Sequence, residues 1–428
     1  MEKKEKLLLL FVVGLLLVLL AGVEINIQNH DEKNDLKLSN DRVPGSPIFI
    51  DNADSNFNWS KTAKENDWCS GSGTWNDPYI IRDLIIEGPA QNNCIEIKNS
   101  NVPFIIQNCE LFPAPQNYYK NGIKLENVNN SKILENEIHS FEGENVGAIS
   151  SWVSSNNNTI FRNVIYDNVN SISFSDGEKN NFSENKITNS LRFSIYLMGG
   201  KNNYIINNNI TELSYSNSVG AITLAWTSDN IVEGNIVTAS FYSGIMLRYS
   251  LRNNITNNVI NDNEGYGIYL SGSDHNNLLI NNLEGNANTP LLISDSDNNS
   301  ILKNNIIGYD RCIQEVNSRD NILKGNNLYW LDLSPISIDN MDPLKNWAYT
   351  AENYEWCSGL GTSDSPYIIE NATINGKNSK SCIEIVNSFR KFEIRNCILY
   401  NSGPGAMMAG ITLPVSYTHL TLPTILLV

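Results

Sequence analysis

The stretch GIMLRYSLRNNITNNVINDNEGYGIYL, residues 244–270, carries the pattern that decides the fold. It begins and ends with a Gly-Ile-x-Leu phrase, and an Ile-x-x-Asn-x-Ile phrase at residues 255–260 lies between them. Apolar and polar residues alternate, β-branched side chains are frequent, and polar turns interrupt the pattern every few residues. Because such runs are too short for ordinary helices, the stretch predicts short β-strands joined by tight turns.

Both phrases recur along the chain, with steps of 22 to 28 residues between repeats. A coil of this length holds three short strands and three turns, and stacked coils pair equivalent strands in parallel about 4.8 Å apart. The sequence therefore predicts an all-β fold, a right-handed parallel β-helix. Aligning the second phrase gives one position per repeat: Asn108, Asn136, Asn163, Asn185, Asn208, Gly234, Asn258, Asn281, Asn304 and Asn326.

The recurring asparagine is expected at a tight corner of each coil. Its side chain tolerates a left-handed backbone and bonds to nearby backbone groups. Stacked equivalents could also form an amide ladder, in which each side chain donates a hydrogen bond to the next. All the aligned positions except Gly234 are the predicted ladder residues.

A leucine-rich repeat is the rival interpretation, because its period of 20 to 29 residues overlaps with this one. That fold needs a helical segment on its convex side. The intervening stretches here, such as residues 151–158 and 271–277, are rich in Ser, Asn and Gly, which are poor helix formers. The composition favours the β-helix.

The chain also contains a long tandem repeat. Residues 46–125 recur without a gap as residues 334–413, with 37 of 80 positions identical. The lead-ins at 46–66 and 334–354 share an Asn-Trp pair and suit a cap over the open end of a solenoid. Residues 415–428 abandon the Asn-rich pattern and resemble translated sequencing-adapter read-through. The predicted organisation is a signal peptide or membrane anchor at 1–23, a spacer at 24–45, a first β-helix module with its cap at 46–330, the start of a truncated second module at 331–414, and a non-native tail at 415–428.

The N-terminal segment predicts export. Residues 7–23 form an uninterrupted apolar run behind a lysine-rich start. Either a cleaved signal peptide or an uncleaved anchor fits the length of this run, and both place the rest of the chain outside the cytoplasm. Asn-x-Ser/Thr sequons, such as those at Asn58 and Asn371, suit an exported glycoprotein, although a chain this rich in Asn, Ser and Thr produces several by chance.

The charge of the chain limits its partners. The formal net charge is −16, and residues 24–428 alone carry 27 basic and 44 acidic side chains, which gives −17. A polyanion repels nucleic acid and anionic lipid headgroups. We therefore expect no nucleic acid partner, and membrane contact only through the N-terminal segment.

Seven cysteines leave two alternatives open. Cys69 and Cys94 are 25 residues apart, about one coil, and could form a disulfide between the cap and the first coil. Alternatively, the cysteines are buried thiols that act as small apolar residues. No Cys-x-x-Cys motif or histidine cluster indicates a zinc site.

The acidic residues offer only a sparse set of site candidates. Asp295, Asp297 and the pair Asp274-His275 lie in turns of adjoining coils, with Arg248 and Arg252 a coil or two earlier. Such residues could form a catalytic cluster for polysaccharide cleavage or mark solvated turns. Asp274, Asp295 and Asp297 are also weak calcium candidates, and no other cofactor is expected. The histidines His30, His139 and His419 are scattered and have no evident partner in sequence.

Aromatic residues are a second set of candidates. They could stack against sugar rings along one face of the predicted solenoid, or they could pack laterally within it. The residues in question are Trp152, Trp226, Tyr242, Tyr249, Tyr266 and Tyr269.

With these phrases in view, the chain resembles the right-handed β-helix repeat proteins of the NosD type and of the carbohydrate-binding and sugar-hydrolase repeat class. The opening of its modules, with Gly71, Gly73, Pro78, Tyr79 and Cys94, resembles that of multi-module archaeal surface proteins of this group. The resemblance covers residues 46–413 and implies the β-helix fold. The group includes lyases, epimerases, hydrolases and binding rods. The copper-related role of the NosD type would need a His or Met cluster that this sequence lacks.

These observations predict an extracellular cell-surface β-helix protein that is a non-catalytic binding or structural module for polysaccharide or surface partners. The alternative is a polysaccharide lyase or glycoside hydrolase that acts on acidic extracellular polysaccharide. The two differ in what an open face must contain, because an enzyme needs convergent acids and a basic residue.

Overall fold

The computed structural model describes residues 42–88, 92–115, 120–143, 146–213, 219–309, 311–405, 408–414 and 425–427. The predicted signal segment and most of the spacer lie outside these residues, as do His30, His419 and most of the tail. No helix within the described ranges is long and apolar enough to cross a membrane.

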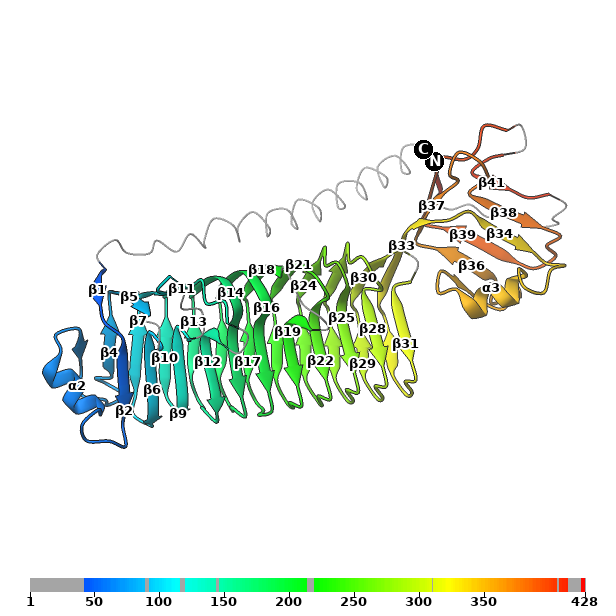
Figure 1. Cartoon of the computed structure of the whole chain (residues 1–428). Helices are drawn as coiled ribbons and strands as arrows, with labels where there is room; N and C mark the ends of the chain where they lie inside the picture. The colour runs from blue at the N-terminus through cyan, green and yellow to red at the C-terminus, as the bar shows by residue number, and fades with distance from the viewer. Residues whose placement is uncertain are drawn as a thin grey trace, which may run out of the picture. The chain divides into compact units, whose positions relative to one another are not determined.

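The chain winds into a right-handed parallel β-helix, which confirms the predicted fold class (Figure 1). Each coil contributes one strand to each of three faces, which we number in chain order. Face 1 contains the Gly-Ile-x-Leu strands: β2 (Ile48–Asp51), β6 (Ile95–Ser100), β9 (Ile123–Val128), β12 (Gly147–Val153), the second halves of β14 (Val164–Ser175) and β16 (Lys186–Met198), β19 (Gly220–Ala225), β22 (Ser243–Arg248), β25 (Tyr266–Ser271), β28 (Leu291–Ser294) and β31 (Ile313–Val316).

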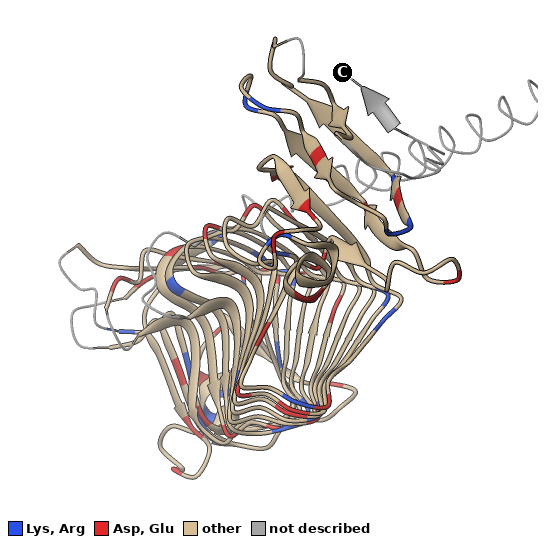
Figure 2. Ribbon diagram, turned by 90° about the vertical axis from the view of Figure 1, so that its right-hand side faces the viewer, with Lys and Arg blue, Asp and Glu red and all other residues tan. Residues whose placement is uncertain are grey.

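Faces 2 and 3 complete each coil. Face 2 consists of β4 (Tyr79–Arg82), β7 (Phe104–Gln107), β10 (Ser131–Leu134), β13 (Thr159–Phe161), β15 (Asn181–Ser183), β17 (Tyr204–Ile206), β20 (Ile231–Glu233), β23 (Asn254–Thr256), β26 (Asn277–Leu279), β29 (Ser300–Leu302) and β32 (Ile322–Lys324). Face 3 consists of β1 (Val43–Gly45), β5 (Leu84–Gly88), β8 (Glu110–Pro113), β11 (Glu137–His139), the first halves of β14 and β16, β18 (Asn209–Leu213), β21 (Ile236–Ser240), β24 (Val259–Asn261), β27 (Asn282–Glu284), β30 (Asn305–Gly308) and β33 (Asn327–Leu333). Figure 2 looks along the solenoid, so that the coils lie one behind another.

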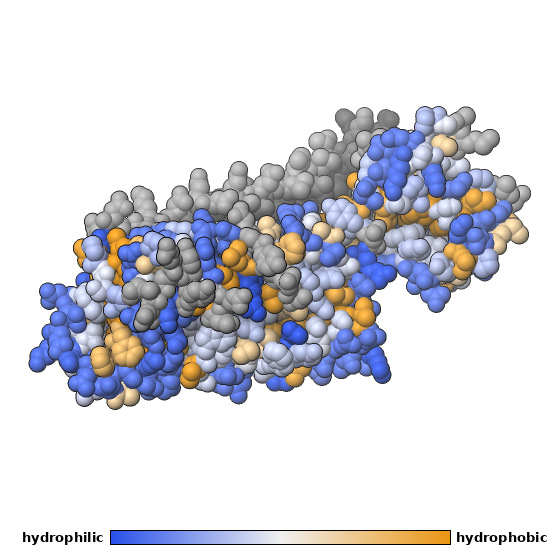
Figure 3. Space-filling view, viewed as in Figure 1, coloured by the Kyte–Doolittle hydropathy of each residue, from blue (hydrophilic) through white to orange (hydrophobic). Residues whose placement is uncertain are grey.

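Period-two alternation sends one set of apolar side chains into the solenoid. Ile255 on face 2, Ile260 on face 3 and Ile268 on face 1 come from the successive strands β23, β24 and β25. Each of these side chains is almost fully buried. The glycine of the Gly-Ile-x-Leu phrase lies at the crowded corner between faces 3 and 1, where a Cβ on Gly244 would stand 2.4 Å from Ile260 Cγ2. The outer surface is largely hydrophilic, with separate apolar patches (Figure 3).

Asparagines line the corner between faces 2 and 3 in a continuous ladder. The Asn208 side chain is typical: its Oδ1 accepts from the backbone N–H of Asn185 at 3.0 Å and from Asn185 Nδ2 at 2.9 Å. Its Nδ2 donates to Phe182 O and to Asn235 Oδ1, both at 2.9 Å. The same arrangement repeats through Asn136, Asn163, Asn185, Asn208, Asn235, Asn258, Asn281, Asn304 and Asn326.

Two positions depart from the alignment made on sequence. Cys109, and not Asn108, stands at the first ladder position, where its N–H donates to Asn136 Oδ1 at 2.9 Å. Asn108 is the preceding left-handed residue, with φ of 52°, and its Nδ2 donates to Asp83 at 2.6 Å. Likewise Gly234 is left-handed and Asn235 occupies the ladder. The prediction of Asn108 as a ladder residue is wrong by one position.

A cap precedes the coils. Helix α2 (Trp59–Glu65) begins after Asn58, whose side chain accepts from Lys61 N–H, and β3 (Cys69–Ser70) then pairs antiparallel with β4. An asparagine at this position satisfies a helical N–H that has no partner within the helix. The helix places Trp59 over the first coil, where it is almost fully buried and stacks on Tyr79.

The second copy of the repeat builds the same cap. This copy contains β34 (Ile336–Asp339), α3 (Trp347–Asn353), β35 (Cys357–Ser358), β36 (Tyr367–Glu370), β37 (Ala372–Asn375), β38 (Ile383–Val386), β39 (Phe392–Arg395), β40 (Cys397–Tyr400) and β41 (Ile411–Thr412). β42 (Ile425–Leu427) follows the copy and pairs with β40. Trp347 Nε1 donates to Ser388 Oγ at 2.8 Å, as Trp59 Nε1 donates to Ser100 Oγ at 2.9 Å. Equal sequence therefore produces equal local structure at both sites.

All seven cysteines are buried and free, which contradicts the alternative of a disulfide between Cys69 and Cys94. Cys94 Sγ instead lies 3.5 Å from Ile86 O and 3.6 Å from Phe112 O, inside the first coil. Burial raises the pKa of Cys69 to about 11 and that of Cys94 to about 12. The thiolate form is thus disfavoured in the folded protein, as for other buried thiols.

We expect these thiols to be unreactive until the protein unfolds. A thiol reagent at pH 8 should label native protein much more slowly than protein in urea. Because burial raises the pKa above the ordinary value of 9.0, the folded state retains protons that the unfolded state loses. The contribution of the buried thiols to the free energy of unfolding is complete below about pH 9 and is lost as the pH rises towards 12. Rapid labelling of native protein would contradict the assignment. So would a urea concentration at the unfolding midpoint that stays constant between these two pH values.

Candidate functional site

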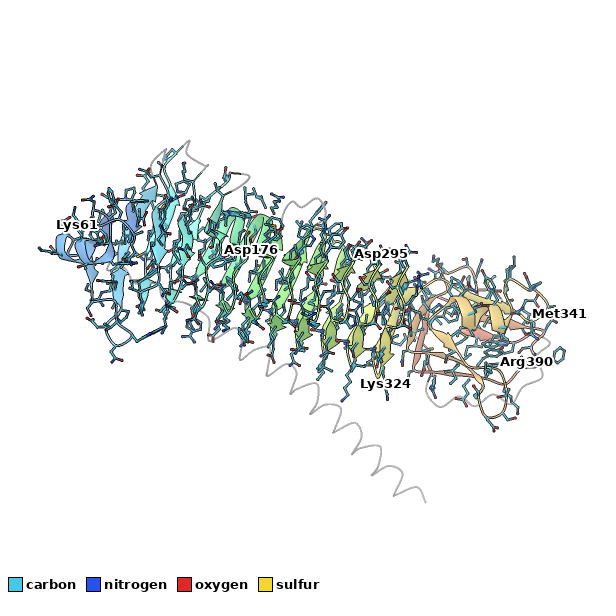
Figure 4. The ribbon with its side chains drawn as sticks, turned by 90° about the horizontal axis from the view of Figure 1, so that it is seen from below. Lys61, Asp176, Asp295, Lys324, Met341 and Arg390 are labelled. Carbon is cyan, nitrogen blue, oxygen red and sulfur yellow. The ribbon has the colours of Figure 1, made fainter. Side chains whose placement is uncertain are left out.

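A row of left-handed corner residues runs along the end of face 1. Backbone pairing aligns Asp176, Gly199, Trp226, Tyr249, Gly272 and Asp295 on successive coils. Figure 4 labels Asp176 and Asp295, the two carboxylates of this row. Trp226 and Tyr249 adopt φ of 53° and 50°, a conformation that costs a residue with a side chain roughly 1–2 kcal/mol. Left-handed corners recur along the whole solenoid and are occupied mainly by Asn, Asp and Gly, so two large aromatic residues at successive corners stand out.

The two rings form an exposed stack. The ring centroids of Trp226 and Tyr249 are 5.6 Å apart with an interplanar angle of 23°. Tyr249 in turn lies over Gly272, where an added Cβ would stand 2.6 Å from Tyr249 Cδ1. Trp226 is 55% exposed and Tyr249 49% exposed. The glycine makes room for the ring stack, and the stack stays open to solvent.

Arg248 lies beside this stack, with its guanidinium carbon 5.8 Å from both ring centroids. A guanidinium over an aromatic face is attracted by the ring quadrupole and loses little of its hydrogen-bonding capacity. Within the described part of the chain, no carboxylate comes within 4.0 Å of Arg248, whereas Arg252 pairs with Asp229 at 2.8 Å. Arg248 therefore presents an uncompensated positive charge on an acidic protein.

A second ring pair lies on face 1, two coils earlier. Phe193 and Tyr196 stack at 4.4 Å, and the guanidinium carbon of Arg192 lies 4.7 Å from the Phe193 ring. Burial raises the pKa of Tyr196, while the charges of Arg192 and Arg248 oppose that rise. Arg192, like Arg248, has no carboxylate within 4.0 Å among the residues that the structure describes. The phenol of Tyr196 thus responds electrostatically to both arginines.

Three further tyrosines extend the surface. Tyr266 lies 5.9 Å from Tyr242 and 5.3 Å from Tyr269, measured between ring centroids. Tyr269 stands in register with Met246, Thr223 and Tyr196 across face 1. We call the set Tyr196, Trp226, Arg192, Arg248, Tyr249, Tyr242, Tyr266 and Tyr269 the aromatic surface; Phe193, which packs against Tyr196, is itself buried. Of the sequence candidates, Tyr266 and Tyr269 lie on β25, whereas Trp226, Tyr249 and Tyr242 lie in the turns directly after β19, after β22 and before β22. Trp152 is exposed on β12.

The acidic candidates are not brought together in the same way. Asp274 Oδ1 accepts from the backbone N–H of Asp297, and Asp297 Oδ1 accepts from that of Arg319, both at 2.7 Å. Asp295 lies in the corner row and accepts from Ser294 Oγ at 2.9 Å. In the described ranges, no three His, Cys, Asp or Glu side chains are arranged to hold a metal ion. These aspartates satisfy backbone and side-chain donors of the turns.

Sequence reasoning missed one charged cluster, which lies on face 3. Arg42 Nη1 contacts Glu110 at 3.2 Å and Glu137 at 2.9 Å, and Tyr166 Oη donates to Glu137 at 3.0 Å. The His139 ring stacks on Tyr166 at 4.7 Å and lies 3.7 Å from Glu110. We call these five residues the face 3 cluster. Burial, and then the hydrogen bond to Glu137, raise the pKa of Tyr166 well above its ordinary value.

A signal for most of this cluster was present in the sequence. Glu110 and Glu137 are one 27-residue step apart, and so are His139 and Tyr166. Outward positions separated by one step become neighbours on adjacent coils. Arg42 follows no such pattern, because it precedes the first coil.

The fold and its exposed face define the class: this chain is a right-handed parallel β-helix protein. Residues 147–307 match the family model described as "Right handed beta helix region". No curated protein matches the sequence.

Several solved structures are similar to this chain. The chain is similar to the Dettilon tailspike protein, with 15% identity, 67% of this chain and 59% of the tailspike chain covered, and a TM-score of 0.46. It is similar to the periplasmic alginate epimerase AlgG, with 13% identity, 83% and 84% covered, and a TM-score of 0.41. It is also similar to DFA-IIIase from Arthrobacter chlorophenolicus A6 in complex with GF2, with 13% identity, 47% and 55% covered, and a TM-score of 0.33. These values concern the fold alone.

Proposed function

We propose that this protein is an exported β-helix rod that binds polysaccharide through its aromatic surface and does not cleave it. The observation that carries the proposal is the exposed stack of Trp226 on Tyr249, held in left-handed corners and fitted over Gly272. The apolar run at residues 7–23 supports a location outside the cytoplasm.

Sugar rings suit this surface for physical reasons. Their C–H faces pack against aromatic rings, while their hydroxyl groups bond to a polar surrounding. Tyrosine and tryptophan supply both features, since each combines a large apolar ring with a hydrogen-bond donor. The Trp226–Tyr249 stack runs along two successive coils, which suits contact with neighbouring units of one polymer.

Replacing Trp226 by alanine is expected to weaken polysaccharide binding about tenfold, because roughly 1.4 kcal/mol of ring contact is lost. Native gels that contain a dissolved polysaccharide would measure this as reduced retardation of the full chain. Trp75→Ala is the matched control, since Trp75 is 68% exposed but lies in the cap. If Trp75→Ala lowers the retardation as much as Trp226→Ala, the aromatic surface is not the binding site.

One observation favours a second candidate function, cleavage of polysaccharide at the face 3 cluster. Glu110 Oε2 and Glu137 Oε2 contact the same nitrogen at 3.2 and 2.9 Å, so they lie at most 6.1 Å apart. Retaining glycosidases hold two carboxyl groups about 5–5.5 Å apart. However, the shared contact with Arg42 occupies both carboxylates and anchors β1, which accounts for the cluster without catalysis. Release of reducing sugars by the full chain, abolished by Glu137→Gln, would establish the enzyme and refute the binding rod.

A further inference from the structure

We propose that the end of the first module is an interaction surface, and that its partner is the cap of the second module. We call residues 344–357, which include α3, the second cap. Glu355 is the residue that binds this cap to the last coil of the first module. The inference concerns how the two modules join, and it does not depend on the proposed function.

The first module ends with two of its faces uncovered. β31 pairs with β28 on face 1 and β32 pairs with β29 on face 2, but within the described ranges neither pairs with a later strand. Leu323 aligns with Ile301, yet Leu323 is 41% exposed whereas Ile301 is fully buried. Glu315 aligns with the buried Ile293, so a charged residue stands at a core position. Unpaired strand edges and an open core need a cover.

Face 3 continues into the second module. β33 pairs with β30 through residues 327–330, and it pairs with β37 through Trp330 and Leu333. One strand therefore belongs to both modules. It tethers the second cap beside the uncovered coil.

Glu355 covers part of the open edge of β31. Its Oε2 accepts from the backbone N–H of Cys312 at 3.3 Å and from that of Ile313 at 3.4 Å. One coil earlier, the N–H equivalent to that of Ile313 belongs to Leu291 and donates to Cys312 O at 3.2 Å. The carboxylate of Glu355 thus takes the place of the carbonyl that a further coil would supply.

Apolar side chains line both sides of the remaining gap. A cleft of about 850 Å³ separates the last coil from the second cap. The lining includes Ile313 and Leu323 on the coil, and Leu344, Tyr349 and Tyr354 on the cap. Leu344 is 69% exposed and Tyr354 is 47% exposed. Because burial of apolar surface is favourable, these two walls attract each other.

The two caps share the residues that face their own coils, as Trp347 repeats Trp59. They differ on the side that faces the cleft. Five cleft-lining residues of the second cap replace others in the first: Leu344 for Asn56, Tyr349 for Lys61, Glu352 for Lys64, Tyr354 for Asn66 and Glu355 for Asp67. The first cap is polar at all five positions, whereas three of them carry leucine or tyrosine in the second cap. The outer side of the second cap is thus suited to a coil, and that of the first cap to water.

Exchanging this outer side tests the assignment. The variant is the full chain with Leu344→Asn, Tyr349→Lys and Tyr354→Asn, which are the residues of the first cap. Because the first cap folds with these residues, the second cap should stay folded. We expect hydrogen exchange at residues 311–316, measured by mass spectrometry, to become about tenfold faster, because exchange follows local opening.

Glu355→Ala tests the carboxylate separately. The backbone N–H groups of Cys312 and Ile313 lose their acceptor in this variant. We expect their exchange to become about tenfold faster as well. Glu355→Gln retains an acceptor oxygen and should keep most of the protection.

Leu360→Ser is the matched control. Leu360 is 70% exposed and lies outside the residues that line the cleft, and Ser72 stands at the equivalent position of the first copy. This variant should leave exchange at residues 311–316 unchanged. Unchanged exchange in the triple variant and in Glu355→Ala would overturn the proposed docking. Faster exchange throughout residues 367–400 would also overturn it, because the replaced side chains would then support the second module itself.

Discussion

Replacing Asn208 by alanine is expected to lower the free energy of unfolding by about 3–5 kcal/mol. The Asn208 side chain is almost fully buried and makes four hydrogen bonds in the ladder. Its removal takes away the acceptor of the Asn185 backbone N–H and breaks the side-chain hydrogen bonds to Asn185, Phe182 O and Asn235 in an interior that excludes water. Each orphaned buried group costs about 1–3 kcal/mol. Urea unfolding followed by circular dichroism would measure the loss.

Asn288→Ala provides the control for this prediction. The Asn288 side chain is exposed, and its backbone N–H donates to Gly265 O whatever the side chain is. We expect a change within about 0.5 kcal/mol, as for most surface substitutions. If the two variants unfold at the same urea concentration, the ladder does not stabilise the solenoid.

Replacing Trp59 by alanine is expected to cost about 3–5 kcal/mol, as for other large residues removed from a core. Trp59 joins the cap to the first coil: its ring stacks on Tyr79 at 5.2 Å and packs against the tilted ring of Phe104 at 4.7 Å. Its Nε1 donates to Ser100 Oγ at 2.9 Å, so the substitution also removes a buried hydrogen bond. The first coil would lose its cover, and its strand ends would be exposed.

Trp75 of the same cap is the internal control, because it is exposed and Trp75→Ala should be nearly neutral. The equivalent substitution in the second copy, Trp347→Ala, removes the same stack and the same hydrogen bond. Thermal melts of the three variants would measure the effects. A Trp59→Ala protein as stable as Trp75→Ala would show that the cap does not depend on this tryptophan.

The repeat made the fold predictable, but it left the register of the corner ambiguous by one residue. The pairs Asn207-Asn208 and Asn257-Asn258 place asparagine at both the left-handed position and the ladder position. Asparagine suits both, since it tolerates positive φ and also bonds through its amide. Where Cys109 replaces the ladder asparagine, the phrase could be aligned on Asn108 alone, and the alignment slipped. Only the hydrogen bonds of the structure separate the two positions.

The candidate site was partly predictable for the same reason. Trp226 and Tyr249 are 23 residues apart, which is one coil, so their stacking follows from the period. That Arg192 and Arg248 lack acidic partners cannot be read from sequence, because it depends on which side chains lie within a few ångströms. The face 3 cluster depends on Arg42, which reaches Glu110 and Glu137 from outside the repeat. Non-periodic contacts of this kind are fixed by the tertiary structure alone.

Oxidative footprinting of the full chain, with and without polygalacturonate, tests the proposed binding surface most directly. Hydroxyl radicals modify exposed aromatic side chains, and mass spectrometry gives a rate for each residue. Trp226, Tyr249 and Trp75 are all about half exposed or more, so each yields a measurable rate in the free protein. The account predicts that the polymer slows oxidation of Trp226 and Tyr249 and leaves Trp75 unchanged. Equal rates at Trp226 with and without a bound polymer would contradict it.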